Sequence, residues 1–213
     1  MQIYTSECGG TKLEILKELG LGVMLSPLAM TRRDYTGIPL ALDNGAFRSW
    51  RLGYPFMERL FLNSIEKGYT WGLPLEFIVC PDLIARGMES LRFSVSWSSR
   101  LAPCPRLALA VQDGMSPGGI HDATADVGFS HLFVGGTKEW KWSTAKDWVQ
   151  FAKDHGLKCH IGRCGTLSAI EEAARLGVDS VDSSNIARND SWEVVRQYQS
   201  PQHLWSKTEG TDL

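Results

Sequence analysis

Short apolar runs recur eight times along this chain of 213 residues, and patterns with helical spacing lie between most of them. The apolar runs cover residues 2–5, 22–25, 39–42, 76–80, 107–111, 131–134, 158–161 and 180–181. The clearer helical patterns cover residues 12–19, 56–67, 88–99, 143–155, 167–176 and 192–199. Such alternation is typical of parallel strands joined by crossover helices.

The number of strands and the chain length together narrow the fold class. Eight strands with crossover helices predict an α/β fold, a compact (β/α)8 barrel of the TIM type, although about 200 residues is the lower limit for this fold. A doubly wound parallel sheet is the alternative. The chain is 43% hydrophobic and 22% charged, which suits one compact domain with a full core. We expect that domain to cover residues 1–205, followed by a frayed tail over residues 206–213.

Charge and hydropathy exclude several classes of protein. The chain has 22 basic and 24 acidic residues, so it does not bind nucleic acid through bulk positive charge, although a local basic rim is compatible with this balance. No apolar run reaches the roughly 18 residues that span a bilayer, and the first residues have no signal-peptide pattern. We therefore expect a cytoplasmic protein without a membrane partner. The five cysteines form no C-x-x-C pair, and we predict neither a disulfide framework, a metal site nor a cofactor.

Polar or glycine residues end six of the apolar runs. They are Asp43, Asp82, Gln112 with Asp113 and Gly114, the pair Gly135 and Gly136, Arg163, and Asp182. Active sites of (β/α)8 barrels form at the carboxyl ends of the strands, so these residues would share one rim. Three of the six runs are followed by a carboxylate that we assign to the site, namely Asp43, Asp82 and Asp182. Like charges at close range raise one pKa while another group stays ionised. Glycosyl transfer uses such a set, and a barrel glycosidase is one functional hypothesis.

Other residues near this rim have the chemistry of a nucleic-acid site. Gly135 and Gly136, followed by Thr137, expose backbone amides to a flat ligand. Basic residues follow several strands, and we select Arg48, Lys141, Arg163 and Arg188 as candidate contacts to a nucleic acid. Trp140 beside Lys141 suggests a stacking surface for an unpaired base, while packing on the barrel is the alternative. His160 either binds a phosphate or belongs to the core.

Four short motifs carry a resemblance to a known family. LDNGAF at residues 42–47, VQDGM at 111–115, VGG at 134–136 and GVDSVDSSNIAR at 177–188 resemble the tRNA-guanine transglycosylase superfamily in order and spacing. VGGTKEWK at 134–141, HIGR at 160–163 and VDSVD at 178–182 are most similar to the phage and bacterial branch that inserts 7-deazaguanines into DNA. The resemblance covers residues 39–188.

The resemblance implies an enzyme, a pentosyltransferase that exchanges guanine for a 7-deazaguanine through a covalent aspartyl-sugar intermediate. In this family pattern Asp182 matches the nucleophile, and Asp43 matches the aspartate that moves protons on the exchanging bases. Asp82, Gln112 and Gly136 match positions that read the purine edge, and Arg188 matches an arginine that contacts the nucleic acid.

One departure from the family pattern bears on the substrate. The tRNA enzymes carry a zinc site of three cysteines and a histidine after the nucleophile, whereas no cysteine follows Cys164 here. The resemblance therefore favours DNA and a free base such as 7-cyano-7-deazaguanine as partners, with tRNA as the alternative. A non-catalytic nucleic-acid-binding module is disfavoured, because three carboxylates would repel phosphate. The oligomeric state is not predicted.

Overall fold

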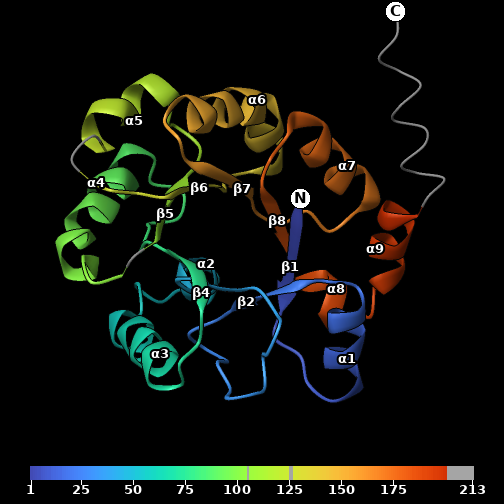
Figure 1. Cartoon of the computed structure of the whole chain (residues 1–213). Coiled ribbons are helices and arrows are strands. Elements are labelled where there is room, and N and C mark those ends of the chain that lie inside the picture. Colours follow the sequence, from blue (N-terminus) through green and yellow to red (C-terminus); the bar gives the residue numbers. More distant parts are fainter. Residues whose placement is uncertain (105, 125–126, 201–213) are drawn as a thin grey trace, which may run out of the picture.

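The chain folds into a closed barrel of eight parallel strands. The computed structural model describes residues 1–104, 106–124 and 127–200. Each strand pairs with its neighbours in chain order, and β1 closes the barrel against β8 by pairing Gln2 with Ser180 and Thr5 with Ser183. Figure 1 shows the helices around this ring of strands. The predicted (β/α)8 barrel is confirmed, and the doubly wound sheet is excluded.

The strands agree with the predicted apolar runs to within two residues at each end. Their bounds are β1 Gln2–Ser6, β2 Gly22–Leu25, β3 Leu40–Leu42, β4 Leu75–Val79, β5 Leu107–Val111, β6 His131–Val134, β7 Lys158–Ile161 and β8 Ser180–Ser183. These short strands form a stable barrel because residues on both faces of every strand are buried.

The helices cover the outside of the barrel and, in places, its mouth. Their bounds are α1 Thr11–Glu18, α2 Ala46–Arg51, α3 Glu58–Thr70, α4 Met88–Trp97, α5 Pro117–Thr124, α6 Lys138–Asp154, α7 Leu167–Leu176, α8 Ser184–Arg188 and α9 Trp192–Gln199, with a 3-10 helix over Ser99–Leu101. The short helices α2, α5 and α8 were not predicted. Helix α6 begins five residues before the predicted start, because Thr137 caps it by accepting a hydrogen bond from the backbone N–H of Trp140.

The two faces of the strands build two separate cores. Leu107, Leu109 and Val111 of β5 point outward and pack in the large cluster under the helices. Ala108 and Ala110 of the same strand point inward. The inner cluster consists of Tyr4, Ala41, Phe77, Val79, Ala108 and Ala110, with Met24 and Phe133 packed against it. Small alanines leave space for the aromatic rings, so side chains fill the barrel as this fold requires.

The sequence also predicted where the domain ends and that no segment spans a membrane. The predicted end of the domain at residue 205 and the tail over residues 206–213 lie outside the described residues. In the part of the chain that the structure describes, no helix is both long enough and apolar enough to cross a membrane.

Candidate active site

The two-residue period of the strands carries polar side chains into the carboxyl-end mouth of the barrel. Ala41 and Ala110 face the barrel interior, and Asp43 and Gln112 follow each of them by two residues. Successive side chains of a strand alternate between faces, so these polar groups continue the inward-facing row. Asp182 lies near the carboxyl end of β8, and its charge raises the pKa of Asp43.

Asp43 is half-buried at the end of β3, and its pKa is raised to about 7. The largest cause is loss of solvation, and the charges of Asp182 and Asp82 raise the pKa further. Backbone N–H groups of Asn44 and Gly45 act in the opposite direction. A carboxyl group with a pKa near neutrality both accepts and releases protons readily, as a general acid and base must.

Asp82 is buried, and two amide side chains hold it. Asn44 Nδ2 donates to Asp82 Oδ1 at 2.8 Å and to the backbone carbonyl of Cys80 at 2.8 Å. Gln112 Nε2 lies 3.3 Å from Asp82 Oδ2. Burial raises the pKa of Asp82 to about 6, and the hydrogen bond from Asn44 works against that rise. Each carboxylate oxygen has two acceptor positions, so Asp82 retains capacity for a ligand N–H.

The amide of Gln112 is occupied by the protein itself. Its Nε2 donates to the Leu83 carbonyl at 3.0 Å and to Ser90 Oγ at 2.9 Å, besides its contact with Asp82. Its Oε1 accepts from the backbone N–H of Ala85 at 2.6 Å. In this arrangement Gln112 positions Asp82 and the loop after β4.

Asp182 is held by a buried histidine from the neighbouring strand. His160 Nε2 lies 3.1 Å from Asp182 Oδ1, and His160 Nδ1 lies 2.8 Å from Ser180 Oγ. The backbone N–H of Arg163 donates to the same Asp182 oxygen at 3.3 Å. An ionised carboxylate only accepts, so Nε2 carries the proton and Ser180 donates to Nδ1 when the ring is neutral. His160 is thus a core residue, as one of the two interpretations expected, and it fixes the orientation of Asp182.

A glycine makes room for Asp182. A Cβ at Gly162 would lie 2.9 Å from the Phe133 ring and 3.3 Å from Asp182 Oδ1. Any side chain at this position would push the carboxylate or the ring aside. The HIGR segment therefore supplies both His160, which orients Asp182, and Gly162, which leaves space for the Asp182 carboxylate.

Hydrogen bonds join the loop after β6 to the loop after β5. Thr137 donates to Asp113 through its backbone N–H at 2.7 Å and through its hydroxyl at 2.6 Å. The Gly135 amide donates to the Val111 carbonyl at 2.9 Å, so it extends the strand ladder. Gly136 has φ +73°, and a Cβ there would lie 2.6 Å from both Asp113 Oδ2 and the Trp140 ring.

Lys141 and Trp140 do not form the exposed stacking surface that the sequence suggested. Lys141 is only 2% exposed, and its ammonium group donates to the Gly162 carbonyl. Burial lowers the pKa of Lys141. Trp140 packs against the outer core, with its ring 5.9 Å from that of Trp148. The prediction that Lys141 lies on the rim is wrong, because α6 begins earlier than expected and turns this side chain inward.

The other expected nucleic-acid contacts lie at the surface. Arg48 in α2, Arg163 after β7 and Arg188 in α8 are exposed. The Arg163 guanidinium donates to the Gly136 carbonyl and lies 5.2 Å from the centre of the Phe47 ring. Its backbone has φ +62°, which is costly for a residue with a side chain and is typical of functional loops.

A hollow of about 310 Å³ adjoins Asp82 on the side of α2. Its walls are Ala46, Trp50, Tyr54, Pro55, Phe56, Asp82, Leu83, Ile84 and Arg86. Asp43 and Asp182 do not line this hollow. Asp82 thus faces an aromatic recess, and the charges of Asp82 and Asp182 both act on Asp43.

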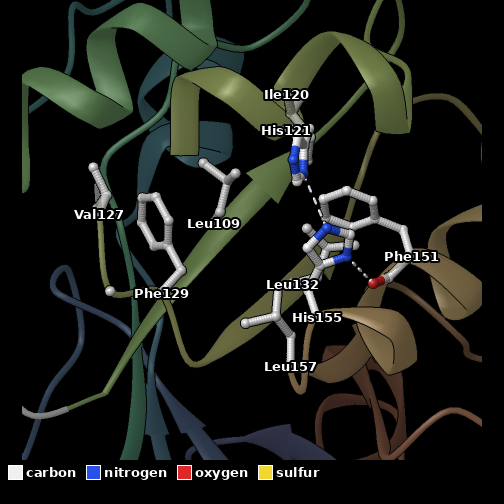
Figure 2. A pocket seen from close by; sticks show the side chains of 10 residues that line it. Leu109, Ile120, His121, Val127, Phe129, Leu132, Phe151, His155 and Leu157 are labelled. Carbon is white, nitrogen blue, oxygen red and sulfur yellow. Dashed lines mark hydrogen bonds between the residues drawn. The ribbon is translucent and has the colours of Figure 1, made fainter. Parts of the chain in front are cut away.

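A second hollow, of about 250 Å³, lies at the other end of the barrel between α5 and α6 (Figure 2). Its walls are mostly apolar and include Leu109, Phe129 and Leu132. At its edge His155 Nε2 lies 2.9 Å from His121 Nδ1. None of the described residues that line it is a carboxylate, whereas three carboxylates lie at the carboxyl ends of the strands.

Sequence reasoning missed Asn44 and Ser180 as parts of this site, and it placed Asp113 on the rim without predicting its contacts with Thr137. Asn44 lies inside the LDNGAF motif, where its position next to Asp43 was the available signal. Ser180 stands two residues before Asp182, at the strand spacing that puts both on one face.

Comparisons with known proteins found no protein-family model and no curated protein that matches the chain. Among the described residues, no group of three or more histidine, cysteine, aspartate or glutamate side chains is arranged to hold a metal ion.

Proposed function

We propose that this protein exchanges guanine in DNA for a 7-deazaguanine base, with Asp182 as nucleophile and Asp43 as proton carrier. The observation that carries the proposal is the pairing of a hydrogen-bonded Asp182 with an Asp43 whose pKa is raised to about 7 in the same mouth. One carboxylate oriented as nucleophile and another able to change its protonation near neutral pH are what a two-step glycosyl transfer requires.

In the first step an Asp182 oxygen attacks C1′ of the target nucleotide. The C1′–N9 bond breaks, its electron pair leaves with guanine, and protonated Asp43 supplies a proton to the departing base. Asp182 then holds the sugar as an ester. His160 and the Arg163 amide support this role, because two donors orient the attacking carboxylate.

In the second step Asp43, now ionised, removes the proton from N9 of the incoming 7-deazaguanine. N9 attacks C1′, and the ester bond breaks to regenerate Asp182. Two displacements on the same carbon retain its configuration. A 7-deazaguanine has carbon in place of N7 and cannot be protonated there, so the new bond resists the reverse reaction.

Asp82 would select the purine. The N1–H and the exocyclic amine of guanine are adjacent donors, and a carboxylate accepts from both. Asn44 and Gln112 hold Asp82 so that it can present its remaining acceptor positions. The motifs that resemble the transglycosylase superfamily support the same role. DNA is preferred over tRNA because no cysteine in this sequence follows Cys164, whereas the tRNA enzymes place zinc-binding cysteines after the nucleophile.

The test is incorporation of radiolabelled guanine into nucleic acid, with duplex DNA, single-stranded DNA and unmodified tRNA offered separately. We expect label in DNA, and unlabelled 7-cyano-7-deazaguanine should compete with it. Incorporation into tRNA alone would overturn the choice of DNA. Label in none of the three, under conditions where the protein hydrolyses a sugar substrate, would favour a glycosidase.

A further inference from the structure

An exposed aromatic surface lies on α2 and the turn that follows it. The exposed fractions are 39% for Phe47, 53% for Trp50, 53% for Leu52 and 58% for Tyr54. Folded proteins that expose large apolar side chains together usually use them for binding. Helix α2 follows β3 directly and starts three residues after Asp43, so this surface lies at the carboxyl-end mouth (Figure 1).

The charge of this surface is positive. Residues 44–57 include Arg48 and Arg51, both exposed, and no aspartate or glutamate. Arg163 reaches the same surface by stacking over Phe47. Aromatic rings interleaved with guanidinium groups are typical of surfaces that bind single-stranded nucleic acid, because rings stack on bases and cations neutralise phosphates.

The surface is continuous with the candidate active site. Trp50 and Tyr54 form one wall of the hollow that Asp82 also lines. A nucleotide whose base reaches Asp82 would therefore place the neighbouring part of its strand over these two rings.

We propose that Trp50 and Tyr54 form a stacking surface for the unpaired bases next to the target nucleotide. This inference rests on the proposed function and names the part of the protein that holds the opened strand. A target within a duplex must leave the stack before its sugar is attacked, and its neighbours then need a replacement for their lost stacking. Self-association through this face is opposed by its arginines, which would meet the arginines of a second copy.

The experiment measures binding of a short, fluorescently labelled, single-stranded oligodeoxynucleotide by anisotropy. The background is Asp182→Asn, so that no covalent adduct contributes to binding. We expect Trp50→Ala and Tyr54→Ala each to weaken binding by about 5- to 100-fold, and Trp50→Phe to retain most of it. Tyr69→Ala is the matched control, because Tyr69 is 54% exposed but lies in the last turn of α3, toward the amino ends of the strands.

The possible outcomes separate this inference from the proposed function. Unchanged binding in the Trp50 and Tyr54 variants would overturn the stacking surface, whether or not base exchange occurs. Equal losses in the Tyr69 variant would overturn it too, since they would show a general effect of exposed aromatics. A wild-type dimer in sedimentation that Trp50→Ala converts to a monomer would assign the face to self-association instead. Weakened binding without any base exchange would support the surface and contradict the proposed reaction.

Discussion

The two ends of the barrel differ in how they treat ionisable groups. At the carboxyl ends of the strands, burial raises the pKa of Asp43 to about 7 and that of Asp82 to about 6. Toward the amino ends, His131 is buried inside the barrel with its pKa lowered to about 4, mainly by burial, so it is neutral at physiological pH. The carboxyl end thus retains groups that oppose folding when ionised, while His131 at the amino end is buried in its neutral form. Stability is sacrificed where chemistry is expected.

Two histidines inside the barrel make the same contrast at closer range. Both rings pack against aromatic residues, His131 on Phe77 at 4.6 Å and His160 on Phe133 at 4.7 Å between ring centres. The ring of His131 forms a hydrogen bond with Ser130 Oγ at 2.8 Å, whereas His160 lies between Ser180 and the carboxylate of Asp182. Similar packing therefore serves structure at one end and orientation of the candidate nucleophile at the other.

The largest effect is expected for Asp182→Asn. The amide keeps the shape of the side chain but is a poor nucleophile, so base exchange should fall by at least about 10³-fold. A protein–DNA adduct that survives denaturation should disappear. Gel electrophoresis of denatured reaction mixtures and incorporation of labelled guanine measure the two effects.

The control for this variant is its thermal unfolding, which should stay close to that of the wild type because the substitution conserves volume. An adduct that persists in Asp182→Asn would place the nucleophile elsewhere. Asp179 would be tested next, although its carboxylate accepts from the Cys159 backbone N–H at 2.8 Å and is engaged in the strand ladder.

The sequence was enough to predict the barrel because eight short apolar runs alternate with helical patterns, and six of these runs end at a polar or glycine residue. Asp43 and Asp182 could be placed at one mouth for the same reason, since strand ends of a parallel barrel share one side. The inward turn of Lys141 could not be predicted, because it depends on where α6 begins, and helix starts are set by a single cap such as Thr137. Three partners of Gln112, namely Asp82, Leu83 and Ala85, lie in the loop after β4, and the sequence of this loop has no periodic pattern that would predict its path.

The second prediction uses pH to test whether Asp43, at the carboxyl end of the barrel, keeps its proton in the folded state. The folded state raises the pKa of Asp43 from 3.8 to about 7, so it binds this proton more tightly than the unfolded state does. The stabilisation is complete below about pH 4 and is lost as the pH rises through about 7, with a limit of about 4 kcal/mol from this group. Asp43→Asn should remove that part of the decline and unfold at higher urea concentration than the wild type at about pH 8.

Urea titrations of wild type and variant at about pH 5 and about pH 8 measure this difference. Asp82 contributes its own decline over a lower range, and it is present in both proteins. Parallel declines in the two proteins would show that Asp43 does not hold its proton in the folded state.

The third prediction sets His160 against His131. His160→Leu removes a donor to Asp182 and should slow base exchange by about 10- to 100-fold, the value of one hydrogen bond to a charged group. His160→Gln keeps an N–H donor and should recover part of the rate. His131→Leu should change the free energy of unfolding without slowing exchange. If both leucine variants slow exchange equally, or glutamine gives no recovery, His160 acts only through packing.

The smallest effect is expected at the hollow between α5 and α6. His121→Ala removes the 2.9 Å contact with His155, whose ring also stacks on Phe151 and bonds its carbonyl at 2.8 Å. A side-chain hydrogen bond near the surface is worth about 1 kcal/mol, so the urea midpoint should fall slightly. Base exchange should be unchanged, because the hollow is formed by the segments that precede β6 and β7 and so lies away from the mouth. A slower exchange rate in this variant would mean that the amino end is coupled to the chemistry, and the functional separation of the two ends would be wrong.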